Sequence, residues 1–221
     1  MTVGFQCFNT AGGYQIDGVY PQFAFKRKLT VACPIKVQES SNVPYWVGDF
    51  DISSGEIAAI VSNTDCAIIR RMNGTARLAV TALNRTVTVY IFGQVLPVAS
   101  NFGFQVFNAA GTLVFDAAQK PLAMVGFPVG EGNFTYNVNR KYAAVVMNQW
   151  LKVESEGHDY GNNNIVKITM GMIREIAGGI TINNILMSHW EQAMDPNQSA
   201  FDQSVPVYSP NRHIIIDVTN Y

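Results

Sequence analysis

GFQCFNTAGGYQID at residues 4–17 and GFQVFNAAGTLVFD at residues 103–116 are two copies of one pattern within a chain of 221 residues. The second copy begins 99 residues after the first, and the two align without gaps. The identical pairs are Gly4/Gly103, Phe5/Phe104, Gln6/Gln105, Phe8/Phe107, Asn9/Asn108, Ala11/Ala110, Gly12/Gly111 and Asp17/Asp116. This internal repeat, together with the chain length, favours two related units of about 100 residues each.

Each copy has the residue pattern of a β-hairpin. Phe104 and Val106, like their counterparts in the first copy, are two residues apart, so one side of the strand can face a core. The predicted turn residues are Asn9 and Gly12 in the first copy and Asn108 and Gly111 in the second, because Asn and Gly adopt positive φ most cheaply. The aspartate that closes each copy can accept hydrogen bonds from nearby backbone N–H groups.

The remaining segments also favour strands, because they alternate apolar and polar residues or form β-branched and aromatic runs between Asn, Gly and Pro. The predicted fold class is all-β, with two tandem, related, antiparallel β-sandwich-like domains. The first spans residues 1–100 and contains hairpin 4–17; the second spans residues 101–221, contains hairpin 103–116 and is enlarged by an insertion. ILMSHWEQAM, residues 185–194, is the best helix candidate, with Pro196 as its stop signal.

Composition indicates a globular chain with few charges. Charged residues make up 14% of the sequence and the net charge is −1, against a usual charged fraction of roughly 25%. A near-neutral surface favours association, so we expect a homo-oligomer; a monomer with a surface of Asn, Gln, Ser and Thr is the alternative. No basic cluster is longer than the run from Lys26 to Lys28, which argues against a nucleic-acid partner. The apolar runs are too short for membrane insertion, and the N-terminus lacks the pattern of a secretory signal.

Two nearly uncharged stretches are predicted strands of particular interest. TVTVYIF at residues 86–92 and HIIIDVT at residues 213–219 carry almost no charge. As edge strands they would be poorly protected and would favour self-association. The alternative is that both are central in their sheets, where no partner is needed.

No catalytic residue is predicted, and we expect the protein not to be an enzyme. Nucleophile and phosphate-binding signatures are absent, and His189 and His213 stand alone. Asp49, Asp51, Ser53 and Glu56 resemble a calcium loop only loosely, so a solvated turn is expected and no metal or cofactor is assigned. Cys7, Cys33 and Cys66 lack metal-binding spacing and are predicted to be reduced, mostly buried thiols.

Tyr45 and Trp46 are the candidate ligand-binding residues. They follow the polar loop ESSNV, and aromatic faces suit both sugar rings and protein interfaces. Burial in a core is the other interpretation of this pair.

Residues 86–126 resemble a segment of minor tail proteins from tailed bacteriophages with long flexible tails. The resemblance rests on a VYIF-type strand, the hairpin and a following Pro-Leu strand. The matching residues are Val89, Tyr90, Phe92, Gly103, Phe104, Gln105, Val106, Phe107, Asn108, Gly111, Phe115, Asp116, Pro121 and Leu122.

The resemblance implies a structural protein of the virion, in the distal tail or tail tip with its host-adsorption apparatus. Such a protein is assembled in the cytoplasm of the host bacterium, and its partners are other phage tail proteins. A carbohydrate- or receptor-binding module at the end of the particle, with a host surface glycan as ligand, is the alternative function.

Overall fold

The computed structural model describes residues 6–8, 14–17, 22–37, 44–94, 103–148, 151–157, 163–193 and 212–221. It describes the backbone alone for residues 6–8, 14–17, 148, 151–157, 163–168 and 188–193. These residues form strands and turns, with no helix among them. The predicted all-β class is therefore confirmed. In the described part of the chain, no helix has the length and apolar character needed to span a membrane.

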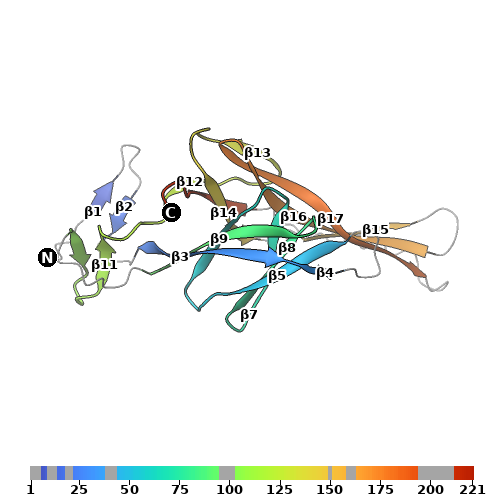
Figure 1. Ribbon diagram of the computed structural model, residues 1–221, viewed down its shortest axis with the longest axis horizontal. Helices are drawn as coiled ribbons and strands as arrows, with labels where there is room; N and C mark the ends of the chain where they lie inside the picture. The colour runs from blue at the N-terminus through green and yellow to red at the C-terminus, as the bar shows by residue number, and fades with distance from the viewer. Residues whose placement is uncertain are drawn as a thin grey trace.

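Two antiparallel sheets form the body of the molecule (Figure 1). The six-stranded sheet has the order β12 (Met124–Gly126), β18 (Arg212–Asp217), β14 (Tyr142–Asn148), β6 (Ile57–Val61), β9 (Arg85–Gln94) and β3 (Phe23–Cys33). The larger sheet has the order β13 (Gly132–Thr135), β17 (Gly179–Ala193), β16 (Asn163–Ile176), β7 (Cys66–Met72), β8 (Thr75–Val80), β5 (Tyr45–Asp51) and β4 (Ile35–Val37), and β15 (Leu151–Gly157) pairs with β16.

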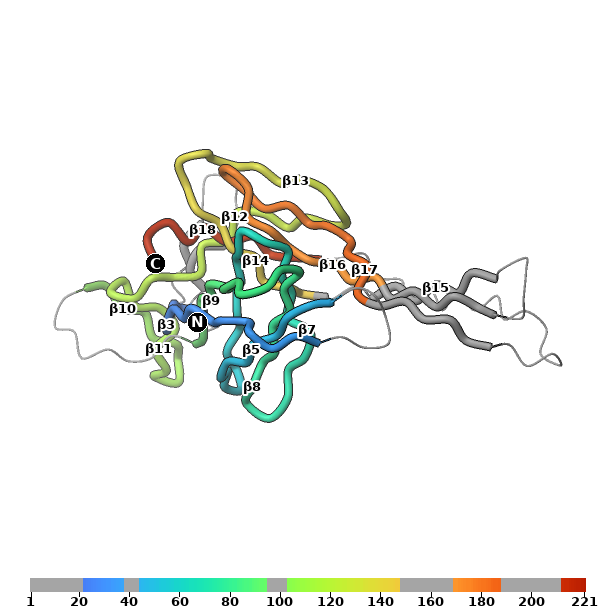
Figure 2. The backbone as a smooth tube through the Cα atoms, turned by 45° about the vertical axis from the view of Figure 1, so that its right-hand side comes forward, coloured from blue at the N-terminus to red at the C-terminus, as the bar shows by residue number. Residues whose placement is uncertain are grey.

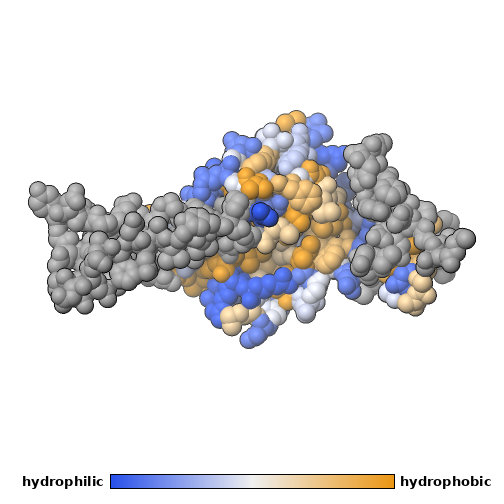
Figure 3. Space-filling view, turned by 180° about the vertical axis from the view of Figure 1, so that it is seen from behind, coloured by the Kyte–Doolittle hydropathy of each residue, from blue (hydrophilic) through white to orange (hydrophobic). Residues whose placement is uncertain are grey.

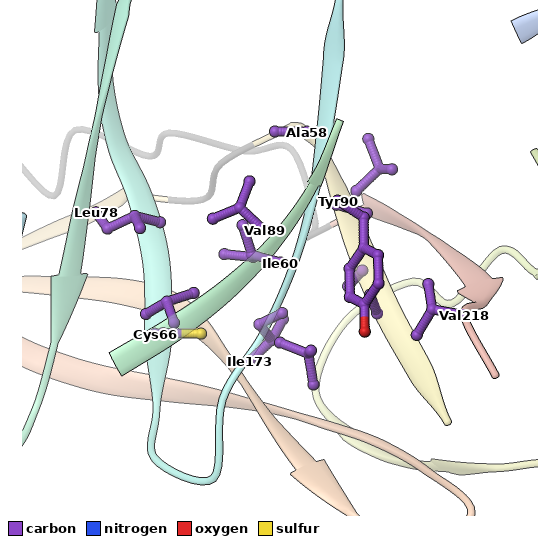
Figure 4. Close-up of a cluster of buried hydrophobic side chains, with 14 of the residues drawn as sticks. Ala58, Ile60, Cys66, Leu78, Val89, Tyr90, Ile173 and Val218 are labelled. Atoms are coloured by element: carbon purple, nitrogen blue, oxygen red, sulfur yellow. The ribbon is translucent and has the colours of Figure 1, made fainter. Parts of the chain in front are cut away.

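The two sheets enclose one main hydrophobic core. Val89 and Ile60 of the six-stranded sheet pack in the same buried cluster as Leu78, Cys66 and Ile173 of the larger sheet (Figure 4). Strand alternation produces this arrangement because every second side chain of a half-buried strand points to the same face. The result is a sandwich-like fold.

Chain crossings between the sheets lie at both sides of the sandwich. On one side β3 ends at Cys33, and β4 begins at Ile35 in the other sheet. On the opposite side the chain leaves β12, an edge of the six-stranded sheet, and enters β13, an edge of the larger sheet (Figure 2). Consecutive edge strands therefore lie on the same side of the sandwich.

The repeated sequence forms two hairpins with the same register. In β1 (Gln6–Phe8) and β2 (Tyr14–Asp17) the partners are Gln6↔Asp17, Cys7↔Ile16 and Phe8↔Tyr14. In β10 (Gln105–Phe107) and β11 (Leu113–Asp116) they are Gln105↔Asp116, Val106↔Phe115 and Phe107↔Leu113. Each partner in the second hairpin is 99 residues beyond its counterpart, and both hairpins shift register at the same step. The predicted hairpins are confirmed.

The segments that follow the two hairpins pair with each other. The N–H of Leu122 donates to the carbonyl of Phe23 at 2.9 Å, and the N–H of Phe25 donates to the carbonyl of Lys120 at 2.8 Å. Phe23 and Leu122 are equivalent positions of the repeat, 99 residues apart. The segments that follow the two copies of the repeat therefore run antiparallel to each other.

Both main sheets contain strands from both halves of the chain. β6 pairs with β14 in the six-stranded sheet, and β7 pairs with β16 in the larger one. A division into domains 1–100 and 101–221 would cut both sheets, so the tandem-domain organisation is not confirmed.

Two predictions about individual elements are corrected by the structure. Residues 185–193 of the predicted helix belong to β17, because they pair with β16 from Asn163↔Ala193 to Met170↔Ile185. TVTVYIF and HIIIDVT are not edges: β9 lies between β6 and β3, and β18 lies between β12 and β14. The alternative, in which both are central strands, is correct, and their lack of charge reflects burial.

Candidate functional site

The candidate site is an exposed apolar surface at the edge formed by β12 and β13. Six large side chains there are exposed, including Phe127 at 67% and Val138 at 75%. The six exposed residues of this edge, here called the β12–β13 patch, are Met124 and Val125 of β12, Phe127 and Val129 between the two strands, and Tyr136 and Val138 after β13. Both of its strands are at the edge of their sheets, where backbone groups are open to pairing with another chain.

Tyr136 joins the two strands of the patch. A Cβ built on Gly126 of β12 would lie 2.1 Å from the Tyr136 hydroxyl oxygen, so Gly126 is needed for this ring to lie across β12. The Tyr136 ring also lies 5.2 Å from the Tyr142 ring, centroid to centroid. Burial and the neighbouring Tyr142 raise the pKa of Tyr136, so the phenol stays neutral well above physiological pH.

The chain segment that carries the patch is almost free of charge, and Arg212 of β18 lies opposite Val129. Glu131 is the only charged residue between positions 121 and 138. The opposite edge of the sandwich carries Lys26, Arg27 and Lys28 in β3 and Lys36 in β4. Charged residues, Lys in particular, protect sheet edges against pairing, so the β12–β13 edge is less protected than the opposite edge of these two sheets. Seen from behind, the molecule has further hydrophobic residues over the middle of its surface, above a hydrophilic band (Figure 3).

Asn108 and Gly111 form the turn of the second hairpin, as predicted. Gly111 has a φ of 76°, and the side-chain oxygen of Asn108 accepts hydrogen bonds from the N–H groups of Ala110 and Thr112 at 3.0 and 2.8 Å. Asp116 accepts from the N–H of Ala118 at 2.8 Å. The first-copy turn residues Asn9 and Gly12 lie outside the described residues.

We expect Gly111→Val to lower the free energy of unfolding by about 1–2 kcal/mol, because a side chain in the left-handed region clashes with its own backbone. No atom lies within 4 Å of a Cβ built there, so the cost comes from the backbone alone. Thr112→Val, one residue later on an exposed position, is the control and should change stability little. Urea unfolding of both variants measures the difference, and equal effects would contradict the turn assignment.

Tyr45 and Trp46 are both half-buried, and they belong to different faces of β5. Trp46 packs against the main core, with its indole nitrogen buried and without a hydrogen-bond partner among the described residues. Tyr45 packs against a second cluster that contains Val47 and Met172. Binding of a ligand by this pair stays a prediction.

Two acidic side chains of the 49–56 segment, those of Asp49 and Glu56, accept hydrogen bonds from arginines. Asp49 accepts from Arg77 at 2.7 and 2.8 Å, and this hydrogen bond lowers the pKa of Asp49. Glu56 accepts from Arg27 at 2.7 and 3.1 Å, and its pKa is lowered for the same reason. Within the described ranges, no three His, Cys, Asp or Glu side chains gather to hold a metal ion.

Cys33 and Cys66 are buried free thiols, as predicted. Burial raises the pKa of Cys33 to about 11 and also raises that of Cys66, so neither is a thiolate at neutral pH. The side chain of Cys7 lies outside the described residues.

Sequence reasoning missed the β12–β13 patch. It predicts only a Pro-Leu strand after the second hairpin, at the start of the run PLAMVGFPV. The available signal was the placement of Phe127 and Val129 among Gly126, Pro128 and Gly130, since Gly and Pro interrupt the alternation that would bury one face of a strand.

The fold and this edge define a sandwich-like all-β protein with an unprotected, apolar sheet edge. Comparisons with protein families, with curated proteins and with solved structures find no match for this chain.

Proposed function

We propose that the chain is a non-enzymatic structural protein that assembles with copies of itself through the β12–β13 patch. The resemblance of residues 86–126 to minor tail proteins supports a place in the distal tail or tail tip of a tailed bacteriophage, next to other tail proteins. The observation that carries the self-assembly is the combination of two adjacent edge strands with six exposed apolar side chains.

Burial of this patch supplies a driving force of the right size. Full burial of one Val, Met or Phe side chain contributes roughly 1.5–3 kcal/mol. Association costs on the order of 4–15 kcal/mol in lost translational and rotational freedom, so several such side chains must be buried together. The patch offers six, and two copies can approach each other without strong charge repulsion, because Glu131 is the only charge in this segment.

Sedimentation velocity tests the assembly. We expect the chain at micromolar concentration to sediment as an oligomer, and Phe127→Lys with Val138→Lys to shift it to the 24.3 kDa monomer. Leu83→Lys is the matched control, because Leu83 is 56% exposed but lies in the turn between β8 and β9. A parent chain that stays monomeric on concentration, or a control that dissociates equally, would contradict assembly through this patch.

The identity of the neighbouring genes tests separately whether the chain is a phage tail protein. Tail genes commonly lie in order along such genomes, as the family resemblance implies. Neighbouring genes for other tail proteins would support the assignment, whereas neighbours of purely cellular function would count against it.

A further inference from the structure

A second surface, between the two sheets, has the features of a peptide-binding groove. It has a cavity volume of about 380 Å³, within the range of roughly 300–1,000 Å³ typical of ligand sites. Its walls are mainly aliphatic and come from β6, β7 and β14; they include Ile57, Ala58, Ile68, Ile69, Val145 and Met147. This groove is distinct from the β12–β13 patch, since the two share no residue.

One wall of the groove has an unpaired strand edge. On one side β7 pairs with β8 from Cys66↔Val80 to Met72↔Thr75. On its other side only Cys66 faces a strand residue, Ile173 of β16. Further along its length, β16 pairs with β15 and no longer with β7, beginning at Met170↔Leu151. Among the described residues, no strand therefore pairs with residues 67–72 on the β16 side.

Two arginines lie at the groove, and the charge of one of them, Arg70, contributes to the lowered pKa of Asp49. Arg70 and Arg71 line it and are exposed. Arg70 donates to the sulfur of Met72 at 3.0 Å, and Arg71 donates to the backbone carbonyls of Glu56 and Ser53 at 2.6 and 3.3 Å. In the described part of the chain, neither guanidinium forms an ion pair, whereas Arg27, Arg77, Arg140 and Arg174 all do.

We propose that this groove binds an extended acidic peptide from another protein chain, which adds as a strand along residues 67–72 of β7. The peptide backbone would pair with the open edge, and alternate apolar side chains would enter the aliphatic groove. Carboxylates of the peptide would pair with Arg70 and with Arg71, which lie on opposite faces of β7, because guanidinium groups bind carboxylates with two parallel hydrogen bonds. An alkyl carboxylate could use the arginines and the apolar walls, but it would leave the backbone edge of β7 unused.

The open edge sets the length of the peptide. Six residues of β7 lack a partner on this side, so a segment of about six residues matches it at the spacing of a strand, roughly 3.3 Å per residue. The inference does not depend on self-assembly, because the peptide is an added molecule and the groove is complete in one copy of the chain.

Fluorescence anisotropy of the full chain with a labelled hexapeptide, EVTITE, tests the proposal. We expect saturable binding that weakens at least about tenfold, a difference of about 1.4 kcal/mol, with the charge-reversed peptide KVTITK and with EVTITE methylated on alternate backbone nitrogens. Arg70→Gln with Arg71→Gln should weaken binding to the same extent. Arg70→Gln alone serves as the second variant if the loss of the Arg71 contacts to Glu56 and Ser53 disturbs folding.

Arg85→Gln is the control variant, because Arg85 is exposed at the start of β9 and does not line the groove. No saturation up to about 1 mM EVTITE would overturn the proposal. Displacement by dodecanoate combined with no effect of backbone methylation would also overturn it, in favour of an alkyl carboxylate site. The dissociation constants from these titrations can be obtained for a monomer or an oligomer, so the test does not require self-assembly.

Discussion

Gly48→Ala is expected to lower the free energy of unfolding by at least about 3 kcal/mol, the upper part of the range for overpacked positions. A Cβ at Gly48 would lie 2.1 Å from the carbonyl oxygen of Ala32 and 3.2 Å from the sulfur of Cys33. The obstacle is mainly backbone, at the end of β3 where the chain crosses to β4. Relief of the contact therefore requires β3 and β5 to separate.

Gly93→Ala is the matched control for this prediction. Gly93 is also within a strand, and a Cβ there would lie 3.2 Å from the end of the flexible Lys26 side chain, which can move. We expect a change of less than about 1 kcal/mol for this variant, since Ala costs less chain entropy than Gly. Urea unfolding curves give both values. Similar midpoints for the two variants would mean that β3 and β5 do not approach closely at Gly48.

The hairpins could be predicted because all their information is local. The turn and both strands lie within 14 residues, and Asn108 and Gly111 each make the backbone interaction that their residue type favours. The two hairpins have the same register, and the sequence between their strands shares Asn, Ala and Gly at equivalent positions. Neither property requires knowledge of the rest of the chain.

Long-range pairing could not be predicted in the same way. Residues 185–193 contain good helix formers, yet they form a strand because residues 163–170 lie beside them as a partner. A local signal for a turn was present: Gly178, between β16 and β17, has a φ of 69°. The pairing of β6 with β14 joins segments more than 80 residues apart, and no pattern in either strand specifies its partner.

The sites were harder to predict than the fold because they depend on exposure. Phe127 and Ile91 are both apolar residues in apolar runs, but one is 67% exposed and the other is fully buried. Their difference comes from strand order, since β9 is central and the segment after β12 is at an edge. The sequence likewise does not mark Arg70 and Arg71 as site residues. The open edge of β7 beside them arises only from the path of β16.

His213 is the most unusual ionisable group in the described part of the chain. It is 2% exposed, and neither ring nitrogen has a hydrogen-bond partner among the described residues. It lies in β18 opposite Val146 of β14. Burial lowers the pKa of His213 to about 4, because an apolar environment disfavours the charged imidazolium. The ring is therefore neutral in the folded protein over most of the physiological range.

This burial predicts a loss of stability in mild acid. Above pH 6.5, the ordinary histidine pKa, the ring is neutral in both the folded and the unfolded chain, and its ionisation has no effect. As the pH falls from about 6.5 towards 4, only the unfolded chain takes up the proton, so the free energy of unfolding decreases. The expected loss from this residue is about 2 kcal/mol at pH 5 and about 3 kcal/mol near pH 4. The arginine-paired carboxylates Asp49 and Glu56 have lowered pKa values, so their contributions are lost at lower pH.

Urea unfolding of the parent chain and of His213→Leu, at pH 7.5 and at pH 5, measures the effect directly. We expect the parent to lose about 2 kcal/mol more than the variant between these two pH values. At pH 7.5 the variant should be at least as stable, because leucine removes two buried nitrogens that lack partners. His213→Phe repeats the comparison with a ring of similar shape. If the parent and both variants lose the same stability on acidification, His213 is not buried as a neutral ring, and the packing of β18 against β14 must differ from the arrangement described.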